Sequence, residues 1–256
     1  MSSDEVLQVT VARGVATLTL DSPANRNALS RAMRARLRSA LADALADDAV
    51  RVVVLDHTGR VFCSGMDLAE AAGGGAREQG VREFPELLQL IWSSPKPVLA
   101  AVRGPARAGG VGLLAACDVV VAGASATFGF SEVRLGIVPA VISAVVLPRM
   151  LPHVAHRLML TGEVFDAAAA LAGGLVDLAV ADDEVSAALD AQVTALAAGA
   201  PAALAETKRL LRARTPAPDF DPLLELSARF LASQEGQEGI AAFREKRPAR
   251  WVPAAD

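Results

Sequence analysis

The sequence has few residues of the kinds that build covalent or metal-bound frameworks. Cys63 and Cys117 are its two cysteines, and neither lies in a C-x-x-C or histidine-rich spacing. A disulfide scaffold and a structural zinc site are therefore not expected, and a reducing compartment fits. Of the histidines, His57, His153 and His156, the last two are spaced to share a helix face, but no third ligand accompanies them. We predict no metal site.

Charge and hydropathy argue against two further classes of partner. The formal net charge is -4 at pH 7, and no cluster of lysine and arginine is interleaved with aromatic residues. A nucleic-acid groove must neutralise phosphates, so no such partner is expected. The first residues lack a basic segment followed by a long apolar stretch, and no run of about 18 apolar residues occurs elsewhere. We therefore expect no membrane partner and a cytoplasmic location.

What the sequence does have is a regular order of short apolar runs and helical stripes. Val6–Val11 and Val15–Leu20 are β-branched runs on either side of Arg13-Gly14, which predicts a hairpin. Ser30 then precedes apolar residues at every fourth position, which predicts a capped helix ending near Asp47. Continuous apolar runs typical of buried parallel strands follow at Val52–Leu55, Pro97–Val102 and Val119–Val121. This order predicts an α/β fold, either a doubly wound sheet or a spiral of ββα units.

The last part of the chain has a helical character. A short strand is expected at Leu178–Val180, and Thr215–Pro218 is a proline-rich joint. The last helix can therefore pack away from the main core, for instance on a neighbouring subunit. Helices are predicted at Asp166–Ala172, Asp183–Ala198, Pro201–Arg214 and Pro222–Arg247.

Two glycine-rich turns follow successive predicted strands. Phe62–Leu68 (FCSGMDL) follows the first buried strand, and Gly104–Gly112 (GPARAGGVG) follows the second. Glycine at a strand-to-helix junction lets ligand atoms approach backbone N–H groups. Each turn alone is equally typical of ordinary tight turns, and neither has the spacing of a phosphate-binding loop. Together they can aim two N–H donors at one carbonyl oxygen, which makes an oxyanion hole.

One carboxylate, Glu132, stands among apolar residues in the stretch Phe128–Pro139. Apolar surroundings raise the pKa of a glutamate toward the working pH, so Glu132 is the candidate general acid and base. The alternative is an ion pair with the nearby Arg134. No side-chain nucleophile is indicated, because Ser64 lacks a G-x-S-x-G context and Cys63 has no partner in the sequence.

These segments resemble the crotonase superfamily of enoyl-CoA hydratases and isomerases. The family strings N-A-L, F-x-A-G-A-D-[IL], G-x-x-x-G-G-G-x-x-L-x-x-x-C-D and F-x-x-[PS]-E-x-x-x-G-x-x-P have counterparts here in the same order. The two longest counterparts look most similar to bacterial methylglutaconyl-CoA hydratases. The matching segments, which cover almost the whole chain, are Asn27–Leu29, Phe62–Leu68, Gly104–Asp118, Phe128–Pro139, Leu160–Glu163 and Gly239–Arg247.

The resemblance implies a fold, an assembly and a site. The implied fold is a crotonase-like spiral of ββα units over residues 1–195 with a C-terminal helical trimerisation region over 196–256, assembled as a homotrimer or a dimer of trimers. The amides of Met66 and Gly109 would form the oxyanion hole for the carbonyl of an acyl-CoA thioester. No cofactor is implied, because coenzyme A is part of the substrate. Substrate contacts are implied for Asn25, Arg26, Ser64, Gly65, Asp67, Leu68 and Gly110, and for Phe243 and Lys246 of a neighbouring subunit.

The sequence departs from the family pattern at Gly112. A hydratase with two glutamates carries the first where this chain has Gly112, whereas the second matches Glu132. We predict hydration of a 2-enoyl-CoA by the single glutamate. The alternatives are double-bond isomerisation, the chemistry of the single-glutamate branch, and acyl-CoA binding without catalysis. Arg107 is a candidate partner for a substrate carboxylate, since guanidinium binds carboxylate bidentately, or else a surface arginine.

Overall fold

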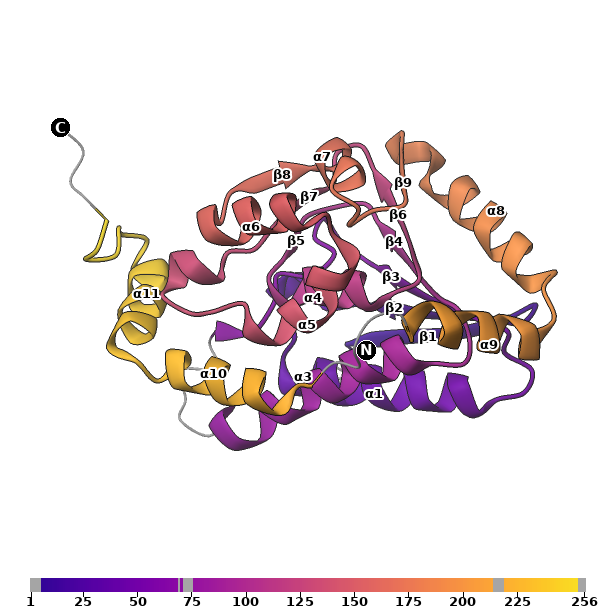
Figure 1. The fold of residues 1–256 in the computed structure, drawn as a ribbon, viewed down its shortest axis with the longest axis horizontal. Coiled ribbons are helices and arrows are strands. Elements are labelled where there is room, and N and C mark those ends of the chain that lie inside the picture. Colours follow the sequence, from indigo (N-terminus) through magenta and orange to yellow (C-terminus); the bar gives the residue numbers. More distant parts are fainter. Residues whose placement is uncertain (1–5, 69, 71–75, 214–218, 253–256) are drawn as a thin grey trace.

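The computed structural model describes residues 6–68, 70, 76–213 and 219–252 (Figure 1). The proline-rich joint predicted at Thr215–Pro218 lies outside these residues, as does Arg214, the expected last residue of the preceding helix.

Six strands form one sheet in the order β1-β2-β3-β4-β6-β9. The predicted hairpin is confirmed: β1 (Leu7–Ala12) and β2 (Val15–Leu20) are antiparallel, and Arg13-Gly14 turns between them with positive φ at both residues. The remaining pairs are all parallel, as the order of elements predicted. Their strands are β3 (Val52–His57), β4 (Val98–Val102), β6 (Val119–Gly123) and β9 (Leu178–Val180).

The continuous apolar runs of the central strands are explained by packing on both faces of this sheet. In β3, Val53 and Leu55 belong to the main apolar core. Val52 and Val54 point the other way and pack with Val185 of helix α8 (Val185–Ala197). Because successive side chains of a strand point to opposite faces, coverage of both faces explains the unbroken apolar run from Val52 to Leu55.

A second, three-stranded sheet explains the repeating unit of the fold. It consists of β5 (Ala106–Arg107), β7 (Thr127–Gly129) and β8 (Val164–Asp166), and an isolated bridge between Cys63 and Ala106 extends it by one segment. The strands β3, β4 and β6 of the large sheet are thus each followed by a short extended segment in the small one, and then by a helix. This is the predicted spiral of ββα units, although these short strands were not predicted.

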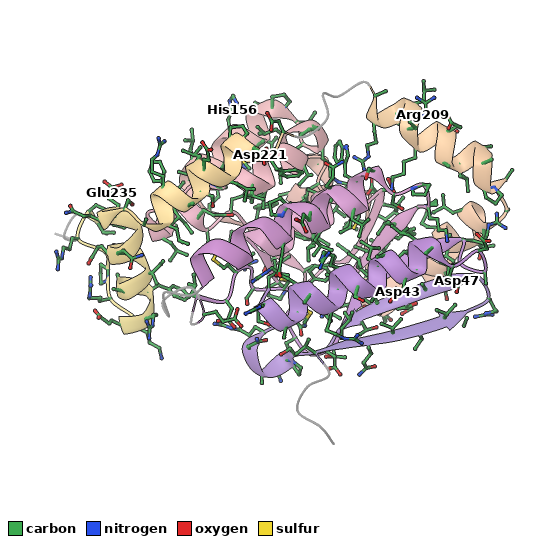
Figure 2. The ribbon with its side chains drawn as sticks, turned by 90° about the horizontal axis from the view of Figure 1, so that it is seen from below. Asp43, Asp47, His156, Arg209, Asp221 and Glu235 are labelled. Carbon is green, nitrogen blue, oxygen red and sulfur yellow. The ribbon has the colours of Figure 1, made fainter. Side chains whose placement is uncertain are left out.

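Helices surround the sheets. Ser30 caps α1 as predicted, its Oγ accepting a hydrogen bond from the Met33 N–H at 3.2 Å. Figure 2, which is seen from below, shows α1 and α3 running side by side in front of the core. The bounds of the helices before α8 are α1 (Arg31–Ala46), α3 (Ala76–Ser93), α4 (Gly109–Ala116), α5 (Ala140–Arg149), α6 (Pro152–Thr161) and α7 (Ala167–Ala172). Three short 3₁₀ helices are η1 (Pro23–Asn25), η2 (Glu132–Leu135) and η3 (Asp182–Glu184).

The last part of the chain is helical, but its final element is divided. The prediction of one helix over Pro222–Arg247 was wrong, because α10 (Asp221–Leu231) and α11 (Gln234–Glu245) are separate. Ser233 breaks the run: its backbone is extended, and its Oγ accepts from the Gly236 N–H at 3.0 Å, which caps a new helix. The predicted boundary between residues 195 and 196 falls inside α8, and the division into a core and a trimerisation region stays a prediction.

A buried ionic cluster fixes α9 (Pro201–Arg212) against the main core. The Lys208 ammonium donates to Asp118 Oδ2 at 2.7 Å, and the same oxygen accepts from the Val98 N–H at 2.8 Å. Arg212 contacts Asp118 Oδ1 at 3.2 Å, and its guanidinium lies 3.6 Å over the Trp92 ring. Figure 2 shows Arg209 of α9 and Glu235 of α11 at opposite ends of the molecule.

In the described parts of the chain, no single helix has the length and hydropathy to cross a membrane; the strongly bent pair Asp182–Ala197 and Pro201–Arg212, with 107° between its axes, passes that test only when both are taken together.

Candidate active site

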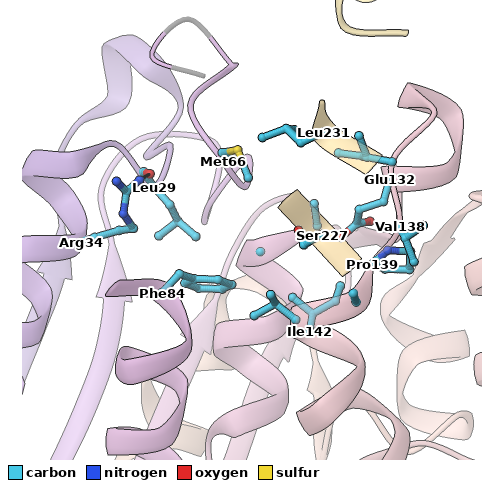
Figure 3. Close-up of a pocket in the computed structure, with 15 residues that line it drawn as sticks. Leu29, Arg34, Met66, Phe84, Glu132, Val138, Pro139, Ile142, Ser227 and Leu231 are labelled. Carbon is cyan, nitrogen blue, oxygen red and sulfur yellow. Dashed lines mark hydrogen bonds between the residues drawn. The ribbon is translucent and has the colours of Figure 1, made fainter. Parts of the chain in front are cut away.

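A cavity of about 100 Å³ lies between the two glycine-rich turns, the segment that follows β7, and helix α10 (Figure 3). Leu29, Met66 and Phe84 lie on one side of it and Glu132 on the other, with Ile142 below. Most of its lining is apolar, and a site with apolar walls and a few polar groups is the usual form of a small-molecule site.

The first glycine-rich turn brings the Met66 amide to this cavity. Gly65 has a φ of +87°, and a Cβ built on it would lie 3.0 Å from the Arg107 carbonyl oxygen and 3.4 Å from the Gly109 nitrogen. Glycine is therefore required, both for the left-handed backbone and for the close approach of the two turns. The Met66 N–H that follows has no acceptor among the described residues.

The second turn presents the Gly109 amide at the start of α4. Ala108 before it has a φ of 48° and a ψ of -117°, a conformation that costs an L-residue strain and is found mainly at functional sites. A Cβ on Gly109 would lie 2.9 Å from Leu29 Cδ1, so a side chain there would displace the cavity wall. The Gly109 N–H also has no acceptor in the described chain. Two unpaired donors from adjoining turns thus border one cavity, as an oxyanion hole requires.

Glu132 opens the short helix η2, and its side chain is turned into the cavity. The residue is only 6% exposed, and its Oε2 has no hydrogen-bond partner in the described structure. Burial raises the pKa of this carboxyl to about 7, against a smaller opposite effect of its own backbone N–H. The predicted alternative, an ion pair with Arg134, is not formed, because the Arg134 Nε donates to the Thr161 carbonyl at 2.8 Å. A carboxyl with this pKa can both give and take a proton near neutral pH.

The space beside Gly112 is filled. A Cβ built on Gly112 would lie 2.5 Å from Ile142 Cγ2 and 3.4 Å from Phe84 Cζ. A glutamate side chain at this position has no room, so the departure from the two-glutamate pattern is built into the packing of α4 against α5. Glu132 is the one carboxylate among the described residues that line the cavity.

The residues predicted to hold coenzyme A are partly brought together outside the cavity. The Arg26 carbonyl accepts from the Ser64 N–H at 3.1 Å, and the Asn25 carbonyl accepts from Ser64 Oγ at 3.5 Å. Buried Asn27 clamps this corner, since its Nδ2 donates to the Thr58 and Val61 carbonyls at 3.0 and 2.8 Å. Gly65, Asp67 and Leu68 continue from Ser64. The arrangement assembles one surface beside the Met66 turn.

Other predicted contacts lie away from the cavity. Arg107 is held on β7, where its Nη1 and Nη2 donate to the Thr127 carbonyl and hydroxyl at 2.7 and 3.0 Å. These bonds engage part of the guanidinium, and its role as a partner of a substrate carboxylate stays a prediction. Gly110 is buried beneath the turn, where a Cβ would lie 2.6 Å from the Cys63 carbonyl oxygen. Phe243 and Lys246 are exposed at the end of α11, and a role toward a neighbouring subunit stays a prediction.

Among the described residues that line the cavity there is no cysteine or histidine. Burial raises the pKa of the Cys63 thiol to about 12, so no thiolate nucleophile is available. Buried His57 accepts a hydrogen bond from the Arg103 N–H at 3.0 Å, a structural role. Among the described residues, no group of three or more His, Cys, Asp or Glu side chains is placed to hold a metal ion.

Sequence reasoning missed several residues that line the cavity. Arg34 of α1 donates to the Leu29 carbonyl and holds the corner that carries the Met66 turn, because the Leu29 N–H in turn donates to the Gly65 carbonyl at 2.8 Å. Ser227 and Leu231 come from α10, far along the chain. A spacing of four residues placed them on one helix face, but no pattern in the sequence indicated which element that face would meet.

Comparisons with known proteins agree with this architecture. The family model described as "Enoyl-CoA hydratase/isomerase" matches residues 10–253. A crystal structure of an enoyl-CoA hydratase from Mycobacterium avium is 44% identical, with a TM-score of 0.88 over 97% of this chain and all of that one (100%). An enoyl-CoA hydratase/isomerase from Pseudoalteromonas atlantica is 32% identical, with a TM-score of 0.87 over 97% and 100%. The 2,3-dehydroadipyl-CoA hydratase of Escherichia coli is 34% identical over 91% of this chain and 93% of its own.

Proposed function

Because this chain belongs to the enoyl-CoA hydratase/isomerase family, we propose that it adds water to a 2-enoyl-CoA thioester, with Glu132 as its single acid–base group. The observation that carries the proposal is the position of Glu132. Its unpartnered carboxyl oxygen lines the same cavity as the unpaired amides of Met66 and Gly109. An acid–base group and an oxyanion hole therefore act on one enclosed substrate.

The proposed reaction begins with the thioester carbonyl oxygen bound by the Met66 and Gly109 N–H groups. Ionised Glu132 takes a proton from water while the oxygen of that water bonds to C3, and the π electrons of the C2–C3 bond move onto the thioester as an enolate. The two amides stabilise this negative charge, and one such donor is typically worth about 3 kcal/mol of the barrier. Protonated Glu132 then returns the proton to C2. One glutamate thus balances every proton of the addition.

The carbonyl-binding half of this site does not depend on side chains. Both donors are backbone N–H groups, and they are aimed by a left-handed Gly65 and by the strained backbone of Ala108. Oriented donors that are fixed before the substrate binds need no reorganisation as charge develops. We propose that the coenzyme A part lies over the adjoining corner formed by Asn25, Arg26 and Ser64, with Asp67 and Leu68 beside it.

Double-bond isomerisation is the second candidate, and the packing around Gly112 favours it. Ile142 and Phe84 occupy the side on which a second carboxylate would hold a water. In this reaction Glu132 removes a proton from C2 of a 3-enoyl-CoA and returns it to C4. No water is added, and the oxyanion hole again holds the enolate.

If the protein bound acyl-CoA without catalysis, Glu132 would be expected to face solvent together with Arg134. Glu132 instead lines the cavity and Arg134 is bound to the Thr161 carbonyl.

For the assembly we propose a homotrimer or a dimer of trimers in which Phe243 and Lys246 reach the coenzyme A of a neighbour. For the location we propose the cytoplasm.

One experiment separates the two reactions. The purified protein is incubated with a 2-enoyl-CoA and, in another tube, with the isomeric 3-enoyl-CoA, and the products are analysed by mass and by ultraviolet absorbance. A product of the 2-enoyl ester that is heavier by one water supports hydration. Unchanged mass with a displaced double bond identifies an isomerase, and no reaction with any chain length contradicts both assignments.

A further inference from the structure

The cavity contains a hydroxyl that the proposed reaction has not used, Ser227 of helix α10. It lines the cavity together with Glu132, and Figure 3 shows it on the same side as Glu132 and across from Leu29. Apart from Glu132 and Arg34, it is the one polar side chain among the described lining residues.

Ser227 occupies a position where the helix pattern calls for an apolar residue. Leu224, three residues before it, packs against the main core, and Leu231, four residues after it, lines the cavity. Residues at these spacings share one face of a helix. A serine between two inward-facing leucines adds no apolar contact, so its hydroxyl requires another explanation.

The hydroxyl is also free of the local bond that several other helical hydroxyls of this chain make. Ser93 of α3, Ser143 of α5 and Thr161 of α6 each donate to a carbonyl of their own helix, at 2.7, 2.6 and 2.8 Å. For Ser227 no partner exists among the described residues. Its proton and lone pairs are therefore available to a molecule in the cavity.

Arg34, the other polar lining residue, is already engaged. Its Nη1 donates to the Leu29 carbonyl and its Nε lies 3.4 Å from Glu83 Oε2. As a cation it also lacks an acceptor for a water proton. The side of the cavity next to Gly112 is closed by Ile142 and Phe84. Among the described side chains that line the cavity, the one that remains to bind a water beside Glu132 is the hydroxyl on α10.

On these grounds, and resting on the proposed hydration, we infer that Ser227 positions the attacking water between its own Oγ and the Glu132 carboxylate. A water needs two to four polar partners and roughly 15 Å³ of free volume. The cavity of about 100 Å³ supplies the volume, and Ser227 and Glu132 supply two partners. Ser227 accepts or donates one hydrogen bond to the water, Glu132 accepts its proton, and the water oxygen bonds to C3. The second water holder thus comes from the C-terminal helices and not from α4.

The test compares two reactions that share Glu132 and the oxyanion hole but differ in whether a positioned water attacks C3. The first is hydration of a 2-enoyl-CoA. The second is exchange of the C2 protons of a saturated acyl-CoA in D₂O, in which Glu132 removes the proton, the thioester enolate forms, the Glu132 carboxyl exchanges its proton with D₂O, and a deuteron returns from it to C2. Ser227→Ala, Ser227→Thr and, as a matched control, Ser93→Ala are each measured in both reactions.

We expect Ser227→Ala to lower kcat for hydration roughly tenfold, the effect of about one lost hydrogen bond, with KM and the exchange rate unchanged. Ser227→Thr, which keeps the hydroxyl, restores hydration at least in part, and Ser93→Ala matches the wild type. Equal hydration by Ser227→Ala and wild type overturns the inference. Equal losses in hydration and exchange also overturn it, since they indicate a general disturbance of the site. A wild-type protein that exchanges C2 protons but never hydrates contradicts the proposed function itself.

Discussion

Gly112 and Ile142 pack so closely that Gly112 has no room for a side chain while Ile142 is in place, since a Cβ on Gly112 would lie 2.5 Å from Ile142 Cγ2. This contact joins α4 to α5 and fills the place that the side chain of a second carboxylate would occupy. The site therefore has a single carboxylate because of the way α4 and α5 pack. A substitution at Gly112 alone does not make room for a second one.

The first prediction follows from that contact. Gly112→Glu alone lowers the free energy of unfolding by about 1–3 kcal/mol, because added atoms in a packed interior force their neighbours out of position. The double variant Gly112→Glu/Ile142→Ala, which opens the space, recovers stability relative to Gly112→Glu. Urea unfolding of the three proteins measures this. If Gly112→Glu were as stable as the wild type, the packing between Gly112 and Ile142 would not be as tight as described.

The second prediction concerns stability and pH at Glu132. Its pKa is raised to about 7 in the folded protein from an ordinary value of 4.5, so between these pH values the folded state binds more protons than the unfolded state. The free energy of unfolding therefore falls as pH rises through this window, by roughly 3 kcal/mol if the whole shift acts. Glu132→Gln removes this component and becomes the more stable protein at pH 8 but not at pH 4.5. Parallel pH–stability curves for the two proteins would contradict the raised pKa.

The same titration controls the rate. Hydration needs the ionised carboxylate in the free enzyme, so kcat/KM rises with pH and levels off above an apparent pKa of about 7. A profile that is flat from pH 5.5 to 8 would mean that another group is the base. The profile is measured with one 2-enoyl-CoA at concentrations well below its KM.

Gly65, which lies beside the cavity, and Gly14, which lies far from it in a hairpin, should respond differently to replacement by alanine. Gly65 and Gly14 both have positive φ, +87° and +79°, but Gly14 lies in the β1–β2 turn. Replacement by alanine costs each about 1–2 kcal/mol of stability. We expect only Gly65→Ala to lose activity as well, by about 100-fold in kcat, because it displaces the Met66 and Gly109 amides. Equal activity of the two folded variants would show that the Met66 and Gly109 amides do not form the oxyanion hole.

The ionic cluster beneath α9 yields a prediction about stability alone. Burial lowers the pKa of Lys208, and Asp118 opposes that change by attraction. Asp118→Asn leaves a buried cation without its partner and lowers the free energy of unfolding by about 3–5 kcal/mol. The double variant Asp118→Asn/Lys208→Met recovers most of the loss. Denaturant unfolding tests this, and the folded fraction keeps its kcat, since neither residue reaches the cavity.

Local chemistry explains what the sequence predicted correctly. The Ser30 cap, the Arg13-Gly14 hairpin and the apolar central strands each depend on residues within a few positions of one another, and all three were confirmed. The two glycine-rich turns and Glu132 could also be singled out from the sequence, because strand-to-helix turns and a carboxylate among apolar residues leave a local signature. Their meeting at one cavity required the fold.

Long-range contacts explain what the sequence did not reveal. The Arg107 side chain is directed to Thr127 by the pairing of β5 with β7, two short strands without a hydrophobic pattern of their own. The break at Ser233 was overlooked although the polar and glycine residues Ser233–Glu238 interrupt the apolar pattern there and the serine is itself a capping signal. The contribution of Ser227 depends on where α10 packs, and nothing in its neighbourhood along the chain encodes that.

The central claim is that Glu132 carries out the acid–base chemistry on an ester held by backbone amides, and its most direct test is turnover of a 2-enoyl-CoA by Glu132→Gln with binding of the same ester measured alongside. Glutamine keeps the size of the side chain but cannot take up the proton. We predict a loss of kcat of about 100- to 10,000-fold, with the dissociation constant of the ester changed by less than about threefold, since a neutral hydrogen bond is worth only about 1 kcal/mol. Turnover at the wild-type rate would contradict the account.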